Sequence, residues 1–370
     1  MRKYILMVLL FCAGVVVIAI FAPLESPVEA QQLPVLGNMA ESGNSFIFVF
    51  DVNGEDYTSI PVPTRGANPW DIEVVAAPDN HEIWFTEPGI DRIARLVYTD
   101  TLDYEFQEYP VAFGCQPLNL DVEGDYVWFT QPGCNKIGRL QRTTGLLTDF
   151  AIGTEDSYPA DLFVDSDGSI WFTQMHANQI ARMVVTSTVH YAIEEYASVY
   201  LADGRPYGIV RSGQGVYVAQ RAKNNVVRFV PSTSSWVVVQ LPASNVNEPF
   251  NLIPDGSGGV WATERSGNRI TRFSIGTFPI VNPFTLTPSA SLPLDLVFDG
   301  VHRIWCTQWS AGQIAQLDLS TGTRTYFPLP VQGLGPTGIA LDDQGRLWIL
   351  ASRVHRLHLP LVLNAYASSE

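Results

Sequence analysis

The sequence predicts an all-β fold, a seven-bladed β-propeller of four-stranded blades whose ring is closed by an N-terminal strand. Three observations lead to this prediction: one motif occurs seven times, Gly and Pro recur throughout the chain, and no long stretch has helical apolar periodicity. The chain has 370 residues, of which 46% are hydrophobic and 16% charged, so it can bury a large core. We expect one folded domain.

The repeated motif is centred on an aromatic residue inside a short apolar strand, as in the segment IWFTE at 83–87. The seven aromatic anchors are Trp84, Trp128, Trp171, Tyr217, Trp261, Trp305 and Trp348, and successive steps are 44, 43, 46, 44, 44 and 43 residues. Four strands in about 44 residues is the usual length of a propeller blade. The regular spacing therefore predicts seven blades.

Each repeat also predicts the order of its strands. A proline roughly thirteen residues before the anchor, such as Pro69 or Pro206, begins a first strand, and the anchor lies in the second. A third strand with alternating side chains follows, as at 92–96, and a more variable fourth strand precedes the next proline.

The two ends of the repeat region are incomplete in a complementary way. Residues 46–63 have the pattern of third and fourth strands without a first or second, and the last repeat ends after 354–359. An N-terminal strand that completes the last blade would remove two exposed sheet edges. We expect this closure, with Tyr57 to Val62 as the donated strand.

The N-terminal segment has the pattern of an export signal. Arg2 and Lys3 precede an uncharged run from Tyr4 to Leu24, and small residues lead up to a predicted cleavage after Ala30. The run is long for a signal peptide, so an uncleaved membrane anchor stays an alternative. We expect a secreted protein with a signal peptide at 1–30, a leader at 31–45, the propeller at 46–359 and a tail at 360–370.

The formal net charge of −15 argues against nucleic acid or anionic lipid as a partner, because both need clustered Lys and Arg. We expect a monomer that takes a small-molecule, peptide or protein ligand at the mouth of the propeller channel. No phosphate-binding glycine loop, CxxC pair, nucleophile elbow or HExxH motif occurs in the sequence.

The motif W-F-T-[EQ] followed by N-x-I-x-R, with P-x-[DGN]-[IL] before it, resembles the virginiamycin B lyase family, also called streptogramin lyases. The resemblance covers the chain from about 46 to 359. It implies a metal-dependent elimination that opens a cyclic ester, with one His as general base and another His with a Glu binding magnesium (Mg2+).

The resemblance places those histidines directly after the proline of the first strand. The residues at the seven corresponding positions are Trp70, Leu118, Ala160, Tyr207, Phe250, Leu294 and Thr337, and none is His. None of them accepts a proton near neutral pH. We therefore expect a binding scaffold that lacks the family's catalytic histidines; the alternative is a carbon-oxygen lyase or lactonase that uses a different base.

Two groups of residues are candidates for ligand binding at the funnel. A polar residue ends the second strand of six repeats: Glu87, Gln131, Gln174, Gln220, Glu264 and Gln308. These side chains could contact a ligand, or could instead tie the blades together. Trp70, Tyr207 and Phe250 could stack on a flat or cyclic ligand, or could only fill the channel.

His176 is the candidate base or ligand contact, because it follows a second strand on the funnel face; an ordinary loop histidine is the alternative. Glu87 and Glu264 offer oxygen ligands for Mg2+, although they lie on the first and fifth blades. The aspartates at 165–168 resemble part of a calcium loop, but no correctly placed Glu follows, so we expect an ordinary turn.

Three cysteines remain after export. Cys115 enters the first strand of the second blade and Cys134 follows its second strand, two points that lie on the same face of a meander. In an oxidising compartment these two should form a disulfide. Cys306 lies inside a strand and should stay a buried free thiol.

Overall fold

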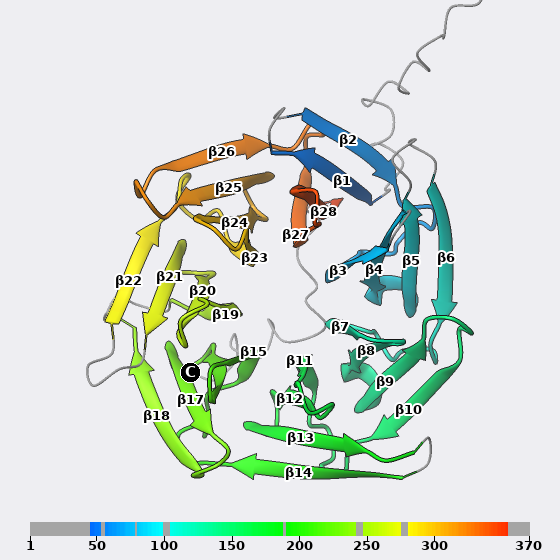
Figure 1. Cartoon of the computed structure of the whole chain (residues 1–370), viewed down its shortest axis with the longest axis vertical. Helices are drawn as coiled ribbons and strands as arrows, with labels where there is room; N and C mark the ends of the chain where they lie inside the picture. The colour runs from blue at the N-terminus through cyan, green and yellow to red at the C-terminus, as the bar shows by residue number, and fades with distance from the viewer. Residues whose placement is uncertain are drawn as a thin grey trace, which may run out of the picture. The chain divides into compact units, whose positions relative to one another are not determined.

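The computed structural model describes residues 45–52, 56–77, 80–98, 104–187, 190–241, 247–274 and 280–353. The chain divides into two compact units, Met1–Leu36 and Gly37–Glu370, and all described residues belong to the second. Seven four-stranded antiparallel sheets form a ring, which confirms the predicted propeller (Figure 1). The expected signal peptide, most of the leader and the C-terminal tail lie outside the described residues.

We label the strands of each blade A to D from the channel outward. Blade 1 comprises β3 (Ile72–Ala77), β4 (Asn80–Glu87), β5 (Arg92–Tyr98) and β6 (Tyr104–Pro110). Blade 2 comprises β7 (Leu120–Glu123), β8 (Tyr126–Gln131), β9 (Lys136–Gln141) and β10 (Leu147–Ala151). Blade 3 comprises β11 (Pro159–Val164), β12 (Ile170–Gln174), β13 (Gln179–Val185) and β14 (Tyr191–Ala197).

The next three blades have the same order. Blade 4 comprises β15 (Pro206–Ser212), β16 (Gly215–Gln220), β17 (Asn225–Val230) and β18 (Ser235–Gln240). Blade 5 comprises β19 (Pro249–Pro254), β20 (Val260–Glu264), β21 (Arg269–Ser274) and β22 (Ile280–Thr285). Blade 6 comprises β23 (Pro293–Phe298), β24 (Arg303–Gln308), β25 (Gln313–Asp318) and β26 (Arg324–Pro328).

Blade 7 joins the two ends of the propeller chain. Its strands A and B are β27 (Leu334–Leu341) and β28 (Arg346–Arg353), and its strands C and D are β1 (Phe46–Asp51) and β2 (Asp56–Pro61). N-terminal closure is therefore confirmed, but the donated segment is a pair of strands. The segment expected as the donor, Tyr57 to Val62, corresponds to β2, the outermost strand. Of the two donated strands, β1 pairs directly with β28.

The repeated I-x-R of strand C has a packing role next to the aromatic anchor of strand B. Arg95 lies directly across from Trp84 in the antiparallel register, with its guanidinium carbon 5.7 Å from the ring centroid. Arg272 stands in the same relation to Trp261, at 6.0 Å. Cation–π contacts thus cover anchors that are themselves buried between strands.

The threonine of the repeated W-F-T ties neighbouring blades together at the channel. Its hydroxyl donates to a backbone carbonyl at the start of the next strand A: Thr86 to Leu118 at 2.7 Å and Thr307 to Thr337 at 2.9 Å. Thr337 in turn donates to the Pro69 carbonyl at 2.9 Å, which links blade 7 to blade 1. Buried hydrogen bonds of this kind hold the inner strands in one register.

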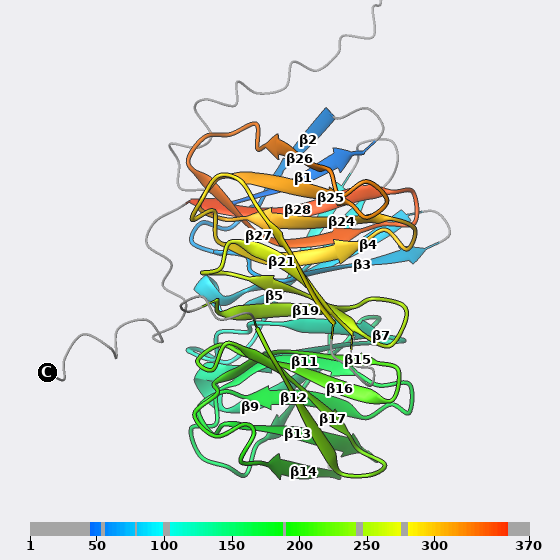
Figure 2. The same ribbon diagram turned by 90° about the vertical axis from the view of Figure 1, so that its left-hand side faces the viewer.

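The strands run between two faces that carry the loops (Figure 2). We call one the B–C face, because the B–C loops and the connections between blades lie there; the opposite A–B face carries the A–B and C–D turns. Two short 3-10 turns, η2 (Pro88–Ile90) and η3 (Pro132–Cys134), lie in B–C loops. In the described part of the chain, no helix is long and apolar enough to span a membrane.

The disulfide prediction is confirmed. Cys115 and Cys134 are bonded on the B–C face, with their Cα atoms 4.6 Å apart. Cys306 is a free, fully buried thiol in β24, and burial raises its pKa well above the ordinary range. The strand order therefore predicts both the bonded pair and the buried thiol, which its burial makes unreactive.

Candidate functional site

Six of the seven residues that follow the strand A prolines gather in the channel and, with residues that flank strands A and B, form an apolar cluster that we call the channel plug. It comprises Leu118, Ala160, Met175, Tyr207, Phe250, Leu294 and Trp309, with Trp70, Tyr158 and Leu292 partly buried against it. Tyr207 and Phe250 stack at 4.2 Å between centroids, and Trp70 meets Phe250 edge-on at 6.3 Å. The three predicted aromatics do lie together, but they contact one another; Tyr207 and Phe250 are buried, and Trp70 is partly buried.

Three blades have a carboxylate at the next position along strand A, and each of these carboxylates accepts a backbone amide of the following blade. Asp161 accepts from the Ile209 amide of blade 4 at 2.8 Å, and Asp71 accepts from the Leu120 amide of blade 2 at 2.8 Å. Burial raises the pKa of Asp161 to about 7, and burial together with the nearby Asp295 raises that of Asp71 well above its usual range. Sequence reasoning missed this inner ring, although the [DGN] of the repeated motif marks it.

The six polar residues at the ends of the B strands are buried, with no exposed surface, inside the blades. Gln131 donates to Asp149 at 2.8 Å and Gln174 donates to Glu195 at 2.9 Å, both on strand D of their own blade. Gln220 donates to the Tyr200 carbonyl at 2.6 Å. Gln308 similarly donates to Ser291 and Thr287. Their contacts are those of the alternative structural role; ligand binding by these residues stays a prediction, and their burial argues against it.

The two acidic members of this set differ from each other. Glu264 bonds to Thr271 and to both Nε and Nη2 of Arg269. Neither carboxylate oxygen of Glu87 has a hydrogen-bond partner among the described residues. Burial and the neighbouring Glu108 raise the pKa of Glu87 to about 8.

These two glutamates do not fit the magnesium site that the family resemblance implies. Both are fully buried, they lie in blades 1 and 5, and the oxygens of Glu264 are occupied by the Arg269 guanidinium and the Thr271 hydroxyl. Mg2+ needs near-octahedral oxygen ligands and keeps several waters, for which two separated buried carboxylates leave no room. No step of chemistry is therefore assigned to a metal there.

His176 lies on the B–C face of blade 3, as its place after strand B predicts. Its ring packs on that of Tyr158 with 4.6 Å between centroids, and its Nδ1 lies 3.4 Å from Oδ1 of Asp156. It borders a pocket of about 310 Å³ between blades 3 and 4, lined also by Met175, Asn178, Asp203, Arg205 and Ala222. This pocket is open to solvent. It adjoins the channel plug, because Met175 belongs to both.

An ion cluster that the sequence did not reveal lies on the same face over blades 4 and 5. Glu248 pairs with Arg221 and with Arg265, and Ser266 donates to it at 2.6 Å. These partners lower the pKa of Glu248 against the effect of its burial. The Arg221 guanidinium also lies over the Tyr207 ring at 5.5 Å, so it connects the cluster to the plug. The signal was available: only blades 4 and 5 have Arg directly after the last residue of strand B.

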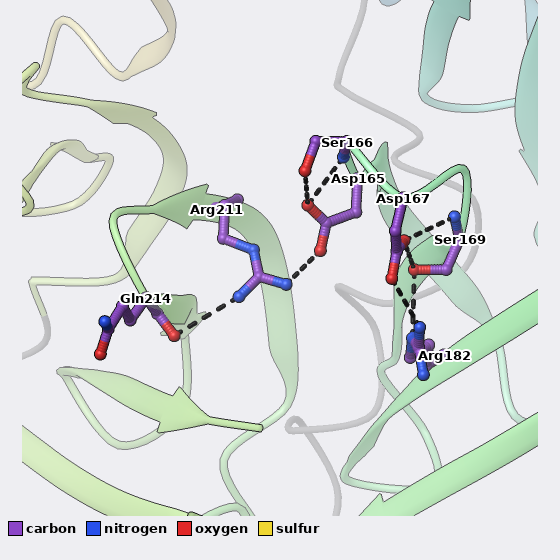
Figure 3. Close-up of polar contacts among 7 residues, drawn as sticks. All are labelled: Asp165, Ser166, Asp167, Ser169, Arg182, Arg211 and Gln214. Carbon is purple, nitrogen blue, oxygen red and sulfur yellow. Dashed lines mark hydrogen bonds and ion pairs between the residues drawn. The ribbon is translucent and has the colours of Figure 1, made fainter. Parts of the chain in front are cut away.

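The acidic turn that resembles a calcium loop has no free carboxylate for a metal (Figure 3). Asp167 accepts from the Ser169 amide at 2.9 Å and pairs with Arg182 at 2.7 Å, and Asp165 pairs with Arg211 of the next blade. The expectation of an ordinary turn is therefore supported. On the same A–B face, His81, Asp342 and Asp343 form a group of metal-ligand type. The guanidinium of Arg346 lies among them, 2.7 Å from Asp342, and no metal is assigned there.

Comparisons with known proteins agree with this architecture. A solved structure described as a streptogramin B lyase shares 22% sequence identity over 83% of this chain and 97% of its own, with a TM-score of 0.68. A catalytically inactive histidine-to-alanine variant of virginiamycin B lyase from Staphylococcus aureus, solved with quinupristin, shares 23% over 79% and 97%, also at 0.68. A protein from Lactobacillus plantarum shares 13% over 80% and 98%, at 0.62.

At these identities the structural likeness is one of fold. No curated protein sequence matches the chain. The virginiamycin B lyase family, however, matches residues 55–358, which include nearly all of the propeller. The chain therefore belongs to the virginiamycin B lyase family.

Proposed function

We propose that the protein is an extracytoplasmic ligand-binding propeller that does not open streptogramin rings. The observation that carries this proposal is the composition of the channel plug. The side chains after the strand A prolines, where the family resemblance places the catalytic histidines, are aromatic, aliphatic or hydroxyl groups packed on one another. An elimination needs a base within hydrogen-bond reach of the substrate proton.

Tyr207 is the one plug residue at these positions with a titratable group, and its environment opposes its use as a base. Burial, with Tyr158 and Asp161 nearby, raises its pKa well above the ordinary value of a tyrosine. A phenol that holds its proton so tightly stays neutral at physiological pH. The family chemistry therefore has no acceptor at this place in the channel.

The pocket beside His176 is the place that we propose for the ligand. It is much larger than a second cavity inside the channel, about 310 Å³ against about 20 Å³, and it combines the partly exposed His176 with Arg205 and Asp203. A concave site next to an apolar cluster with a few convergent polar groups is the usual form of a small-ligand site. The disulfide on the same face is consistent with a protein folded outside the cytoplasm.

The proposal is tested with a type B streptogramin such as quinupristin, incubated with purified protein in Mg2+ or in chelator. Ring opening by elimination gives an isomer of equal mass, so product is followed by chromatography and fragment spectra. We expect the cyclic form to persist in both conditions. Ring opening that chelator abolishes would overturn the proposal.

A carbon-oxygen lyase or lactonase is the second candidate, favoured by the contact of His176 with Asp156. A carboxylate beside an imidazole can orient it as a general base. Chelator-independent opening of a cyclic ester that is lost in His176→Ala would support this candidate. His190→Ala is the matched control, because His190 is an exposed histidine of the same blade in the C–D turn on the opposite face.

Binding at the pocket is tested independently of turnover by an NMR screen of small polar fragments. We expect fragments that bind the wild type and the His190→Ala protein but bind at least about tenfold more weakly to His176→Ala. A set of bound fragments that none of the substitutions affects would move the ligand site elsewhere.

N-terminal sequencing of exported protein should begin at Gln31, and a start at Met1 would contradict the cleaved signal.

A further inference from the structure

A small cavity lies in the channel. Its wall includes side chains that come one position after the strand A residues already described for the channel. Its volume is about 20 Å³, enough for one water-sized species. Asp71, Asn119, Asn251 and Asp295 supply carboxylate and amide groups to its wall, and plug residues border it as well. The carboxylate and amide oxygens of these four side chains are hydrogen-bond acceptors and potential cation ligands.

Two of these residues bring carboxyl groups into the cavity wall, and a bound cation would favour their ionised form. Asp71 accepts from the Leu120 amide, and Asp295 accepts from the Ile339 amide at 2.7 Å and from Asn251 at 2.5 Å. Among the described residues, none of the hydrogen-bond partners of either carboxylate is cationic. Blade 7, which lies between their blades, has Gly338 at the corresponding position. Blade 7 therefore contributes no side chain at that position, although its Thr337 also lines the cavity.

Asn119 provides an independent observation. Its side chain is 6% exposed, and its Nδ2 donates to Asp161 at 2.8 Å, which fixes the orientation of the amide. Its Oδ1 has no hydrogen-bond partner within the described part of the chain. An unpaired buried acceptor that borders a cavity is costly unless the cavity holds a species that it can bind.

We propose that this cavity binds one hard divalent cation of the calcium class. A water molecule could donate to Asn119 but would leave two buried carboxylates without a counter-charge. Calcium accepts carboxylate, amide and hydroxyl oxygens in an irregular arrangement, whereas magnesium keeps waters for which the cavity has no space. The ion would stabilise the inner ring where seven strands A converge, independently of any ligand on the B–C face.

The test uses the whole mature protein, gel-filtered into metal-free buffer and analysed for calcium by mass spectrometry. We expect about one calcium per chain in the wild type. Protein is also unfolded in chelator and then refolded either with or without calcium. We expect the protein refolded without calcium to melt at a lower temperature. Asp71→Asn removes one of the two carboxylates and should therefore lose at least about nine-tenths of the calcium. The variant should still fold, because two blades already have Asn at this position and the amide oxygen can accept from the Leu120 amide.

Asp121→Asn is the matched control, since Asp121 also accepts a backbone amide of the next blade, from Val164 at 2.6 Å, but does not border the cavity. It should keep its calcium. If Asp71→Asn does not fold, Asn119→Leu replaces it with the same expected loss. The proposal would be overturned if the wild type held no metal and its melting temperature did not respond to calcium. A proton shared by the channel oxygens would then replace the cation. Equal calcium in wild type and Asp71→Asn would overturn the proposal too.

Discussion

Glu87 gives blade 1 a destabilising interaction that grows with pH, and Glu87→Gln should remove it. In blades 2 and 3 a glutamine at this position donates to a carboxylate on strand D. In blade 1 the strand register places Glu108 at the position of that carboxylate, but its neighbour on strand B is the carboxyl group of Glu87. Burial and Glu108 raise the pKa of Glu87 to about 8, from 4.5 in an unconstrained chain. A glutamine there would supply the missing amide donor.

The sign follows from the direction of the shift. A carboxyl with a raised folded-state pKa holds its proton in the folded protein while the unfolded chain releases it, so stability is highest at low pH and falls as pH rises from about 4.5 towards 8. Between about pH 4 and about pH 7 the loss amounts to at most about 3 kcal/mol. Because glutamine does not ionise, the stability of Glu87→Gln relative to the wild type should increase by that amount over the same range.

Urea denaturation across this pH range measures the difference. Gln131→Glu is the reciprocal control, because it places a carboxyl opposite Asp149 in blade 2, where Lys136 pairs with Asp149 much as Arg92 pairs with Glu108 in blade 1. It should gain the pH dependence that Glu87→Gln loses. A stability difference between Glu87→Gln and wild type that stays constant from pH 4 to about 8 would refute this account of the charge.

Further predictions concern the other buried groups. Glu264→Gln should destabilise by about 1.5 to 3 kcal/mol at neutral pH, the opposite sign to Glu87→Gln, because it weakens a charge-assisted bond to Arg269; a neutral or stabilising result in urea would contradict that contact. Trp305→Ala should cost about 3 to 5 kcal/mol, since the ring is 1% exposed, and a melting temperature close to that of the wild type would count against the anchor role. Replacing both cysteines of the Cys115–Cys134 disulfide with serine should cost about 3 kcal/mol in denaturation, given 19 residues of separation. Thiol labelling of the mature protein, which lacks Cys12, should find one thiol, Cys306, and only after denaturation; labelling of the native protein would contradict its burial.

The sequence by itself determined the number of blades, the order of the strands, the closure of the ring by N-terminal residues and the disulfide. These features depend on local periodicity and on the alternation of strand direction, which places Cys115 and Cys134 on one face whatever the side chains around them do. The aromatic anchors and their turn residues repeat seven times, so each blade supplies the same information again.

The tertiary structure alone decided which repeated positions are buried and what each of them contacts. A repeat places a residue at the same point in every blade but does not specify its partner, which comes from another strand or blade and varies. Gln131 therefore meets Asp149, while Glu87 meets no donor. Only closure of the ring brings Trp70 against Phe250 in the channel, and only the gathering of loops from blades 3 and 4 creates the pocket at His176. These contacts join residues far apart in the chain, and local periodicity carries no information about such distances.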